Sequence, residues 1–187
     1  MMKLFLSSLA LIVGLQCAAY ATEFNQVQVA SSNIAFQYKQ MGVSMDGKFK
    51  KFTAQLSFDP EQLKKTKAIL DVDLASIDAG SAEADEEVAG KSWFNTKAFP
   101  IAHFAATSVK QLQGNHYEMT GKLTIKSKTQ DIVVPVTFTP QGKSGVFDGS
   151  FMLRRGDFNI GEGAWSKFDI IANDITVKFR ITASNGK

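Results

Sequence analysis

The sequence predicts an all-β fold, an antiparallel barrel of eight strands with one or two short helices. Apolar and polar residues alternate over many short segments, which places large apolar side chains on one face of a sheet and polar ones on the other. Of the 15 phenylalanines, all but Phe5 lie beyond residue 21, and many occupy these apolar rows. Turn residues such as Asp59-Pro60 separate the segments, and this pattern of short strands is typical of a closed antiparallel sheet.

The N-terminal residues predict a secretory signal peptide, Met1 to Ala21, ahead of a single domain over residues 22–187. Lys3 is the positive charge, the apolar run after it is too short to span a bilayer, and Ala19-Tyr20-Ala21 fits the cleavage pattern. An uncleaved membrane anchor is the alternative. The single cysteine, Cys17, lies inside this segment. We therefore expect a periplasmic protein with no disulfide, which must be held together by core burial.

The charge pattern gives no sign of a nucleic-acid-binding protein. The chain carries 21 Lys and Arg against 18 Asp and Glu, a formal net charge of +3. This mild excess says little by itself, but basic residues such as Lys64, Lys65 and Lys67 look like a solvated loop or strand flank rather than a phosphate-binding track, so no nucleic-acid partner is expected.

Rows of apolar residues with the same strand parity define the expected inward faces. In the first half of the chain they are Ile34, Phe36, Tyr38, then Val43, Met45, Gly47, Phe49, then Phe52, Ala54, Leu56, Phe58, and Ala68, Leu70, Val72, Leu74. The alternation slips by one position after Phe49, which predicts a bulge near Lys50-Lys51. In the second half they are Tyr117, Met119, Gly121, Leu123, Ile125, then Ile132, Val134, Val136, Phe138, then Phe147, Gly149, Phe151, Leu153, and Ile175, Val177, Phe179, Ile181.

One short helix is expected between Ser81 and Ser92. Ser81 is a good N-cap, and acidic residues crowd the first turns, where the helix dipole favours negative charge. Trp93 and Phe94 follow, and with Phe99-Pro100 they form an aromatic corner that leads into a strand containing Phe104.

Several short motifs follow one another along the mature chain: Gly47-x-Phe49-x-x-Phe52, Phe58-Asp59-Pro60, Ser76-Ile77-Asp78-Ala79-Gly80, Trp93-Phe94, Phe99-Pro100-x-Ala102-x-Phe104, Thr120-Gly121-x-Leu123-Thr124-Ile125, Val133-Val134-Pro135-Val136 and Arg155-x-Asp157-Phe158-Asn159-Ile160. In order and spacing they resemble the YceI-like family of secreted, lipocalin-like proteins. The resemblance implies an elongated antiparallel barrel around an apolar tunnel that holds a polyisoprenoid or similar long-chain lipid, in the periplasm of Gram-negative bacteria. The chain departs from the family pattern where Ala84, rather than the usual arginine, precedes Asp85, and the segment Gly161–Lys167 with Trp165 looks like a subtype feature.

The inward aromatic rows supply candidates for the lining of such a tunnel. The expected lining residues are Phe36, Tyr38, Phe49, Phe104, Tyr117, Met119 and Phe151. Each also fits an ordinary packed core, and the sequence leaves both interpretations open. The inward glycines Gly47, Gly121 and Gly149 favour an open axis slightly because they leave room there, although glycine also serves barrel corners.

Arg155, Trp93 and Phe94 are the candidates for the mouth of the tunnel. If the strand that holds Phe151 continues, Arg155 points inward, where it can pair with a phosphate, a quinone carbonyl or a carboxylate. The alternative is a salt bridge with Asp157 or another acid. Trp93 and Phe94 either gate the tunnel or form a plain hydrophobic plug.

Signals for catalysis are few. His103 and His116 have outward parity and lack the spacing of metal ligands, so no metal site is predicted. Arg155, Asp157 and Tyr117 are the candidates for a reactive group in a cavity, and they form no recognised constellation. We therefore expect a protein that is not an enzyme, with no catalytic residue and no cofactor beyond a bound polyisoprenoid or quinone.

The sequence thus predicts a periplasmic carrier of a long-chain isoprenoid lipid, a quinone or a polyprenyl phosphate. One alternative is an envelope stress or redox accessory protein that acts through a protein partner, and another is a lipid-modifying enzyme. A transient contact with a membrane or a membrane protein, and a homodimer, stay open as further interactions.

Overall fold

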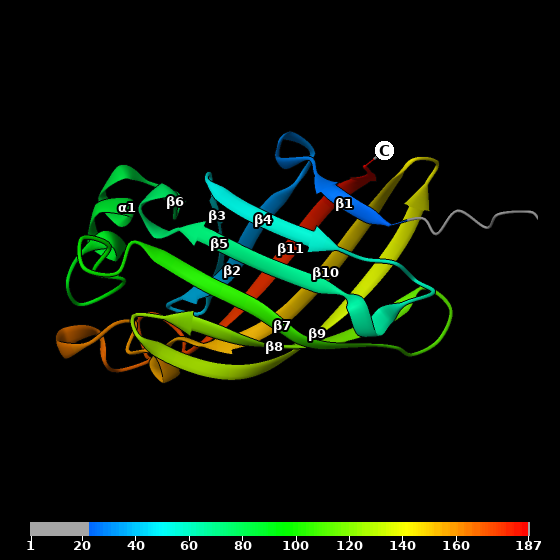
Figure 1. Ribbon diagram of the computed structural model, residues 1–187. Helices are drawn as coiled ribbons and strands as arrows, with labels where there is room; N and C mark the ends of the chain where they lie inside the picture. Colours follow the sequence, from blue (N-terminus) through cyan, green and yellow to red (C-terminus); the bar gives the residue numbers. More distant parts are fainter. Residues whose placement is uncertain (1–22, 187) are drawn as a thin grey trace, which may run out of the picture.

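The computed structural model describes residues 23–186, which form one curled antiparallel sheet with a short helix at one end (Figure 1). The bounds of these eleven strands and the helix are β1 Phe24–Val27, β2 Asn33–Gln40, β3 Val43–Phe49, β4 Phe52–Ser57, β5 Lys67–Asp73, β6 Ile77–Asp78, α1 Ala82–Ala89, β7 Ile101–Gln111, β8 His116–Ile125, β9 Lys128–Gln141, β10 Ser144–Arg154 and β11 Asp174–Asn185. The expected signal peptide, Met1 to Ala21, lies outside the described residues. Within them, no helix combines the length and apolar character needed to cross a membrane.

The strand order closes the sheet on itself. Neighbouring strands run β4-β5-β7-β8-β9-β10-β11-β2-β3-β6, and every pair is antiparallel. β1 pairs with β11 and also reaches the other side of the sheet, because the backbone N–H groups of Phe24 and Phe58 donate to each other's carbonyls at 2.9 and 3.1 Å. The prediction of an all-β antiparallel barrel is therefore confirmed.

The strand count and the expected bulge differ from the prediction. There are eleven strands among residues 23–186 rather than eight, partly because β1 and β6 are only four and two residues long. Lys50-Lys51 is a corner between strands with different partners, since β3 pairs with β2 and β6 whereas β4 pairs with β5. Ser76 holds this corner by accepting the N–H of Lys50 at its carbonyl (3.0 Å) and that of Lys51 at its hydroxyl (2.9 Å).

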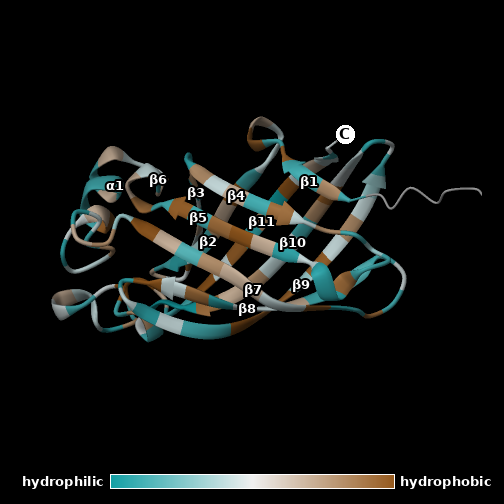
Figure 2. Ribbon diagram, viewed as in Figure 1, coloured by the Kyte–Doolittle hydropathy of each residue, from teal (hydrophilic) through white to brown (hydrophobic). Residues whose placement is uncertain are grey.

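The wall alternates in polarity as the strand pattern requires. Hydrophobic and hydrophilic bands alternate along the long strands in Figure 2. On β2, for example, Ile34 and Phe36 are buried while Lys39 is exposed. This alternation places one apolar row per strand on the inside of the barrel.

The helix α1 lies where the sequence predicts it. The hydroxyl of Ser81 accepts the N–H of Ala84 at 3.2 Å, so Ser81 is the N-cap of α1. Glu83 and Asp85 lie in the first turn, and Gly90 ends the helix. α1 lies over one end of the barrel, on the opposite side from β1 (Figure 1).

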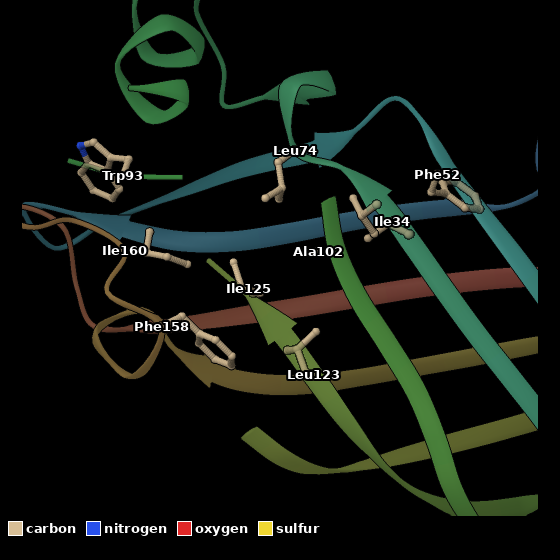
Figure 3. Packing of buried hydrophobic residues seen from close by; sticks show 10 residues of the cluster. Ile34, Phe52, Leu74, Trp93, Ala102, Leu123, Ile125, Phe158 and Ile160 are labelled. Carbon is tan, nitrogen blue, oxygen red and sulfur yellow. The ribbon is translucent and has the colours of Figure 1, made fainter. Parts of the chain in front are cut away.

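Buried aromatic rings mark the two ends of the barrel. Near β1, five rings interlock with centroids 4.8 to 6.4 Å apart: Phe24, Phe58, Tyr117, Phe138 and Phe147. We call this the closed end. At the other end, below α1, Trp93, Phe158 and Ile160 belong to a second cluster with Leu74 and Ile125 (Figure 3).

Candidate ligand cavity

An apolar cavity of about 450 Å³ occupies the interior of the barrel. Side chains from ten strands, all but β1, line it, with the helix α1 contributing Ala84 and Val88. Its size falls within the range of small-molecule sites, and its lining is almost entirely aliphatic and aromatic. The interior is therefore not filled by its own side chains.

Nearly every residue that the sequence nominates as lining borders this cavity. They are Phe36, Tyr38, Phe49, Trp93, Phe94, Phe104, Met119, Phe151 and Arg155. Tyr117 is the exception, and its prediction as a lining residue is wrong: it packs at the closed end, where its ring centre lies 5.4 Å from that of Phe58 and only 5 % of the residue is exposed. Burial, followed by the charge of Glu61, raises the pKa of the Tyr117 phenol. Strand parity predicts the face of a residue correctly but says nothing of its depth along the barrel axis.

The inward glycines shape the wall by receiving phenylalanine rings. A Cβ at Gly47 would overlap the ring of Phe36, one at Gly121 the ring of Phe104, and one at Gly149 the ring of Phe179. Phe36 and Gly47 are direct cross-strand partners, as are Phe179 and Gly149. These rings therefore lie flat against the wall, and the space that the glycines leave is used to keep large rings out of the lumen.

The open end of the cavity lies beside α1. The exposed side chains of Gln40, Glu83 and Glu87 belong to the lining there, whereas interlocked rings obstruct the closed end. The exposed Gln55 on β4 also borders the cavity. The contribution of α1 to the lining was not expected from the sequence. The spacing of Glu83 and Glu87 is a signal for it, because residues four apart share one side of a helix.

The Tyr38 phenol is a polar group in the lining. It donates a hydrogen bond to the carbonyl of Ala79 at 3.0 Å, which ties β2 to the segment before α1. Burial raises the pKa of this phenol, and the nearby Asp85 carboxylate adds to the rise. The Asp85 carboxylate therefore lies close to this end of the cavity.

Arg155 borders the cavity but makes contacts that the sequence did not predict. It is 1 % exposed, and its hydrogen bonds within the described residues go to six backbone carbonyls at 2.7 to 3.3 Å: Ile160, Gly161, Trp165, Lys167, Ile171 and Ala172. Five N–H donors are thus fully used. Asp157 instead lies 3.6 Å from Arg154. Burial lowers the pKa of the Arg155 guanidinium.

Aromatic rings complete the surroundings of Arg155. Its guanidinium lies 5.1 Å from the ring centre of Trp93 and 4.8 Å from that of Phe168, within the range of cation–π contacts. Trp93 in turn lies 5.4 Å from Trp165, whose indole N–H donates to Glu87 at 2.7 Å. Trp93 and Trp165 therefore join the helix to residues 155–173 at the open end.

The groups considered for catalysis are not brought together. Tyr117 packs at the closed end, Arg155 is saturated near α1, and Asp157 pairs with Arg154. His103 is exposed and lies 2.6 Å from its cross-strand partner Asp71. In the part of the chain that the structure describes, no three His, Cys, Asp or Glu side chains gather in a way that could hold a metal ion.

The fold and the cavity together define a lipocalin-like protein, a small antiparallel barrel around an apolar interior. The chain belongs to the YceI-like domain family, whose model matches residues 26–183. The resemblance inferred from the motifs is thereby confirmed.

Relatives and solved structures agree with this membership. A UPF0312 protein of Photorhabdus laumondii is 31% identical over 133 residues, which cover 67% of this chain and 69% of the relative. The crystal structure of BcnA from Burkholderia cenocepacia has a TM-score of 0.83 and 40% identity, and the match covers 85% of this chain and 100% of BcnA. A polyisoprenoid binding domain from Saccharophagus degradans has the same fold, with a TM-score of 0.67 at 11% identity over 89% of this chain and 100% of that domain.

Proposed function

We propose that this protein is a periplasmic carrier that holds a long-chain isoprenoid lipid in its barrel and performs no chemistry on it. The observation that carries the proposal is the unfilled apolar cavity of about 450 Å³, open beside α1 and obstructed at the other end. Family membership and the polyisoprenoid binding domain of the same fold support this class of guest. The periplasmic location rests on the expected signal peptide.

The lining can hold such a guest through its tail alone. Burying one methylene group is worth about 0.8 kcal/mol, so a prenyl unit contributes about 3 kcal/mol. Several units outweigh an association cost of about 4–15 kcal/mol. A cavity with few polar groups is therefore sufficient for tight binding.

The charges around the cavity favour a neutral head group such as a quinone over a polyprenyl phosphate. Glu83 and Glu87 carry carboxylates at the open end, and the Asp85 carboxylate contributes to the raised pKa of the Tyr38 phenol. Arg155, the basic residue of the lining, has its donors occupied by backbone carbonyls. A phosphate beside these carboxylates would face like charges, which typically costs several kcal/mol.

The proposal is tested by the lipid content of protein purified from bacterial envelopes under native conditions. Mass spectrometry should find an isoprenoid lipid in the wild type and none in Phe151→Arg, because a charge would then enter the apolar lining. Met152→Arg is the matched control. Met152 is the chain neighbour of Phe151 and is 64 % exposed on the outer face, so this variant should leave lipid uptake unchanged. A lipid-free wild type that also fails to take up added quinones would refute the carrier function.

A further inference from the structure

An exposed apolar surface adjoins the open end of the cavity. Four side chains form it, and we call them the rim patch: Met41, Val43, Phe168 and Ile170, which are 74 %, 63 %, 47 % and 43 % exposed. Met41 lies in the turn between β2 and β3, Val43 is the first residue of β3, and Phe168 and Ile170 belong to the segment before β11. The two segments lie side by side, because the N–H of Met41 donates to the carbonyl of Ile170 at 2.7 Å and the N–H of Ala172 to that of Lys39 at 2.9 Å.

The rim patch is continuous with the cavity lining. Gln40 and Ile171 are bridge partners, and both belong to the lining. Their chain neighbours, Met41 and Ile170, belong to the patch. The apolar surface therefore continues from the cavity, across one edge of its opening, to the outside of the protein.

Met41 occupies a position where a methionine is unfavourable for the fold. It is the first residue of a two-residue hairpin turn, with φ values of 49° at Met41 and 82° at Gly42. Turns with positive φ at both positions prefer Asn, Asp or Gly first, because a larger side chain is strained there. A strained, exposed apolar side chain at the rim of a cavity is better explained by contact with something outside the protein.

The ring of Phe168 is also positioned for contact with something outside the protein. Its ring lies 4.8 Å from the buried Arg155 guanidinium, and the backbone carbonyl of the preceding Lys167 accepts a hydrogen bond from Arg155 at 3.1 Å. Nearly half of the side chain nevertheless stays exposed. The ring is therefore oriented in advance and loses little conformational freedom on contact.

The charges beside the patch suit the surface of a lipid bilayer. Lys39 and Lys167 are exposed chain neighbours of the patch, and lysines beside apolar side chains typically extend to lipid phosphates. Asp169, within the same segment, directs its carboxylate to the backbone N–H of Ile170 at 3.0 Å. Glu87 of α1 accepts the indole N–H of Trp165 at 2.7 Å, so one of its carboxylate oxygens is already engaged beside this segment.

We propose that the rim patch docks the open end of the barrel on a lipid bilayer, with Met41 and Phe168 inserted at the boundary between head groups and acyl chains. The purpose of this contact rests on the proposed carrier function, since a guest that is insoluble in water must pass directly between bilayer and cavity. The contact itself depends only on the patch.

Binding of the full mature protein to vesicles of phosphatidylcholine, measured by flotation, tests the docking. Met41→Asn should weaken binding about tenfold, because the insertion of one large apolar side chain is lost. The same variant should melt at an equal or higher temperature than the wild type, because Asn suits the positive φ of this turn. The opposite signs of the two effects separate a lost contact from a damaged fold.

Leu112→Asn is the matched control. Leu112 is 56 % exposed and lies in the turn between β7 and β8, at the other end of the barrel, so this variant should bind vesicles as the wild type does. Equal weakening by Met41→Asn and Leu112→Asn would overturn the proposal, as would a wild type that takes up lipid yet never floats with vesicles. A dimer in solution that Met41→Asn disrupts, without vesicle binding, would also overturn it. Vesicle binding without lipid uptake would instead support docking and refute the carrier function.

Discussion

Single glycines decide how much of the barrel interior is free. Phe179 on β11 lies over Gly149 on β10, and the contact is so close that an added Cβ would overlap the ring. The same arrangement repeats for Phe36 over Gly47. Each ring therefore contributes apolar surface to the lining without occupying the axis, which a ring in the usual orientation perpendicular to the sheet would do.

At this scale we expect Gly149→Ala to close part of the cavity. The new methyl group forces the ring of Phe179 off the wall and into the lumen, which should destabilise the protein by about 1–3 kcal/mol and weaken lipid uptake. Thermal melting and titration with a quinone would measure the two effects. Ser150→Ala, on the exposed face of the same strand, should change neither, and undiminished uptake by Gly149→Ala would show that the ring does not control the lumen.

At the scale of elements, residues 155–173 form an irregular wall at the open end that depends on two buried cations. Arg155 gathers six carbonyls of this segment. Lys126, which is 7 % exposed, donates to the carbonyl of Asn159 at 2.6 Å and to the Glu162 carboxylate at 2.8 Å. The segment has little regular secondary structure of its own, so these side chains satisfy backbone groups that a strand ladder would otherwise satisfy.

Replacing Arg155 should therefore collapse this element. Arg155→Met leaves several buried carbonyls without donors, and we expect the free energy of unfolding to fall by about 4 kcal/mol or more. Urea denaturation would measure the loss. Arg154→Met removes an exposed partner of Asp157 and should cost less than about 1 kcal/mol. Similar losses for the two variants would contradict the assignment of Arg155 as the centre of the segment.

At the scale of the whole molecule, the barrel divides into a packed end and a hollow end. The interlocked rings around Phe58 and Phe138 stabilise the closed end without any guest. The rest of the interior is apolar surface around a cavity, and such a cavity lacks the dispersion contacts that a filled core has. A bound lipid would supply them, so folding and binding should be thermodynamically linked.

Removal of the lipid should consequently lower the melting temperature. A guest at a hundredfold excess over its Kd stabilises the folded state by about 2.7 kcal/mol, which corresponds to a shift of about 5–10 °C for a chain of this size. Calorimetry of native, delipidated and reloaded protein would measure it. Phe151→Arg should show no shift on addition of lipid. Identical melting of native and delipidated wild type would contradict a guest in the cavity.

The sequence was sufficient for those features that depend on local patterns. Alternation along β2, β8 and β10 predicted which side chains face inward, and Ser81 predicted the start of α1, because strand pleating and helix capping act over a few residues. Nine of the ten residues that the sequence nominated for the cavity border it.

Only the tertiary structure decided where along the axis each inward residue lies and which distant groups meet. Parity was right for Tyr117, but the pairing of β8 with its neighbours placed it among the rings of the closed end. The hydrogen bonds of Met41 to Ile170 and of Trp165 to Glu87 join segments far apart in the chain. Contacts between distant segments depend on sheet curvature and strand register, and the local periodicity of the sequence determines neither.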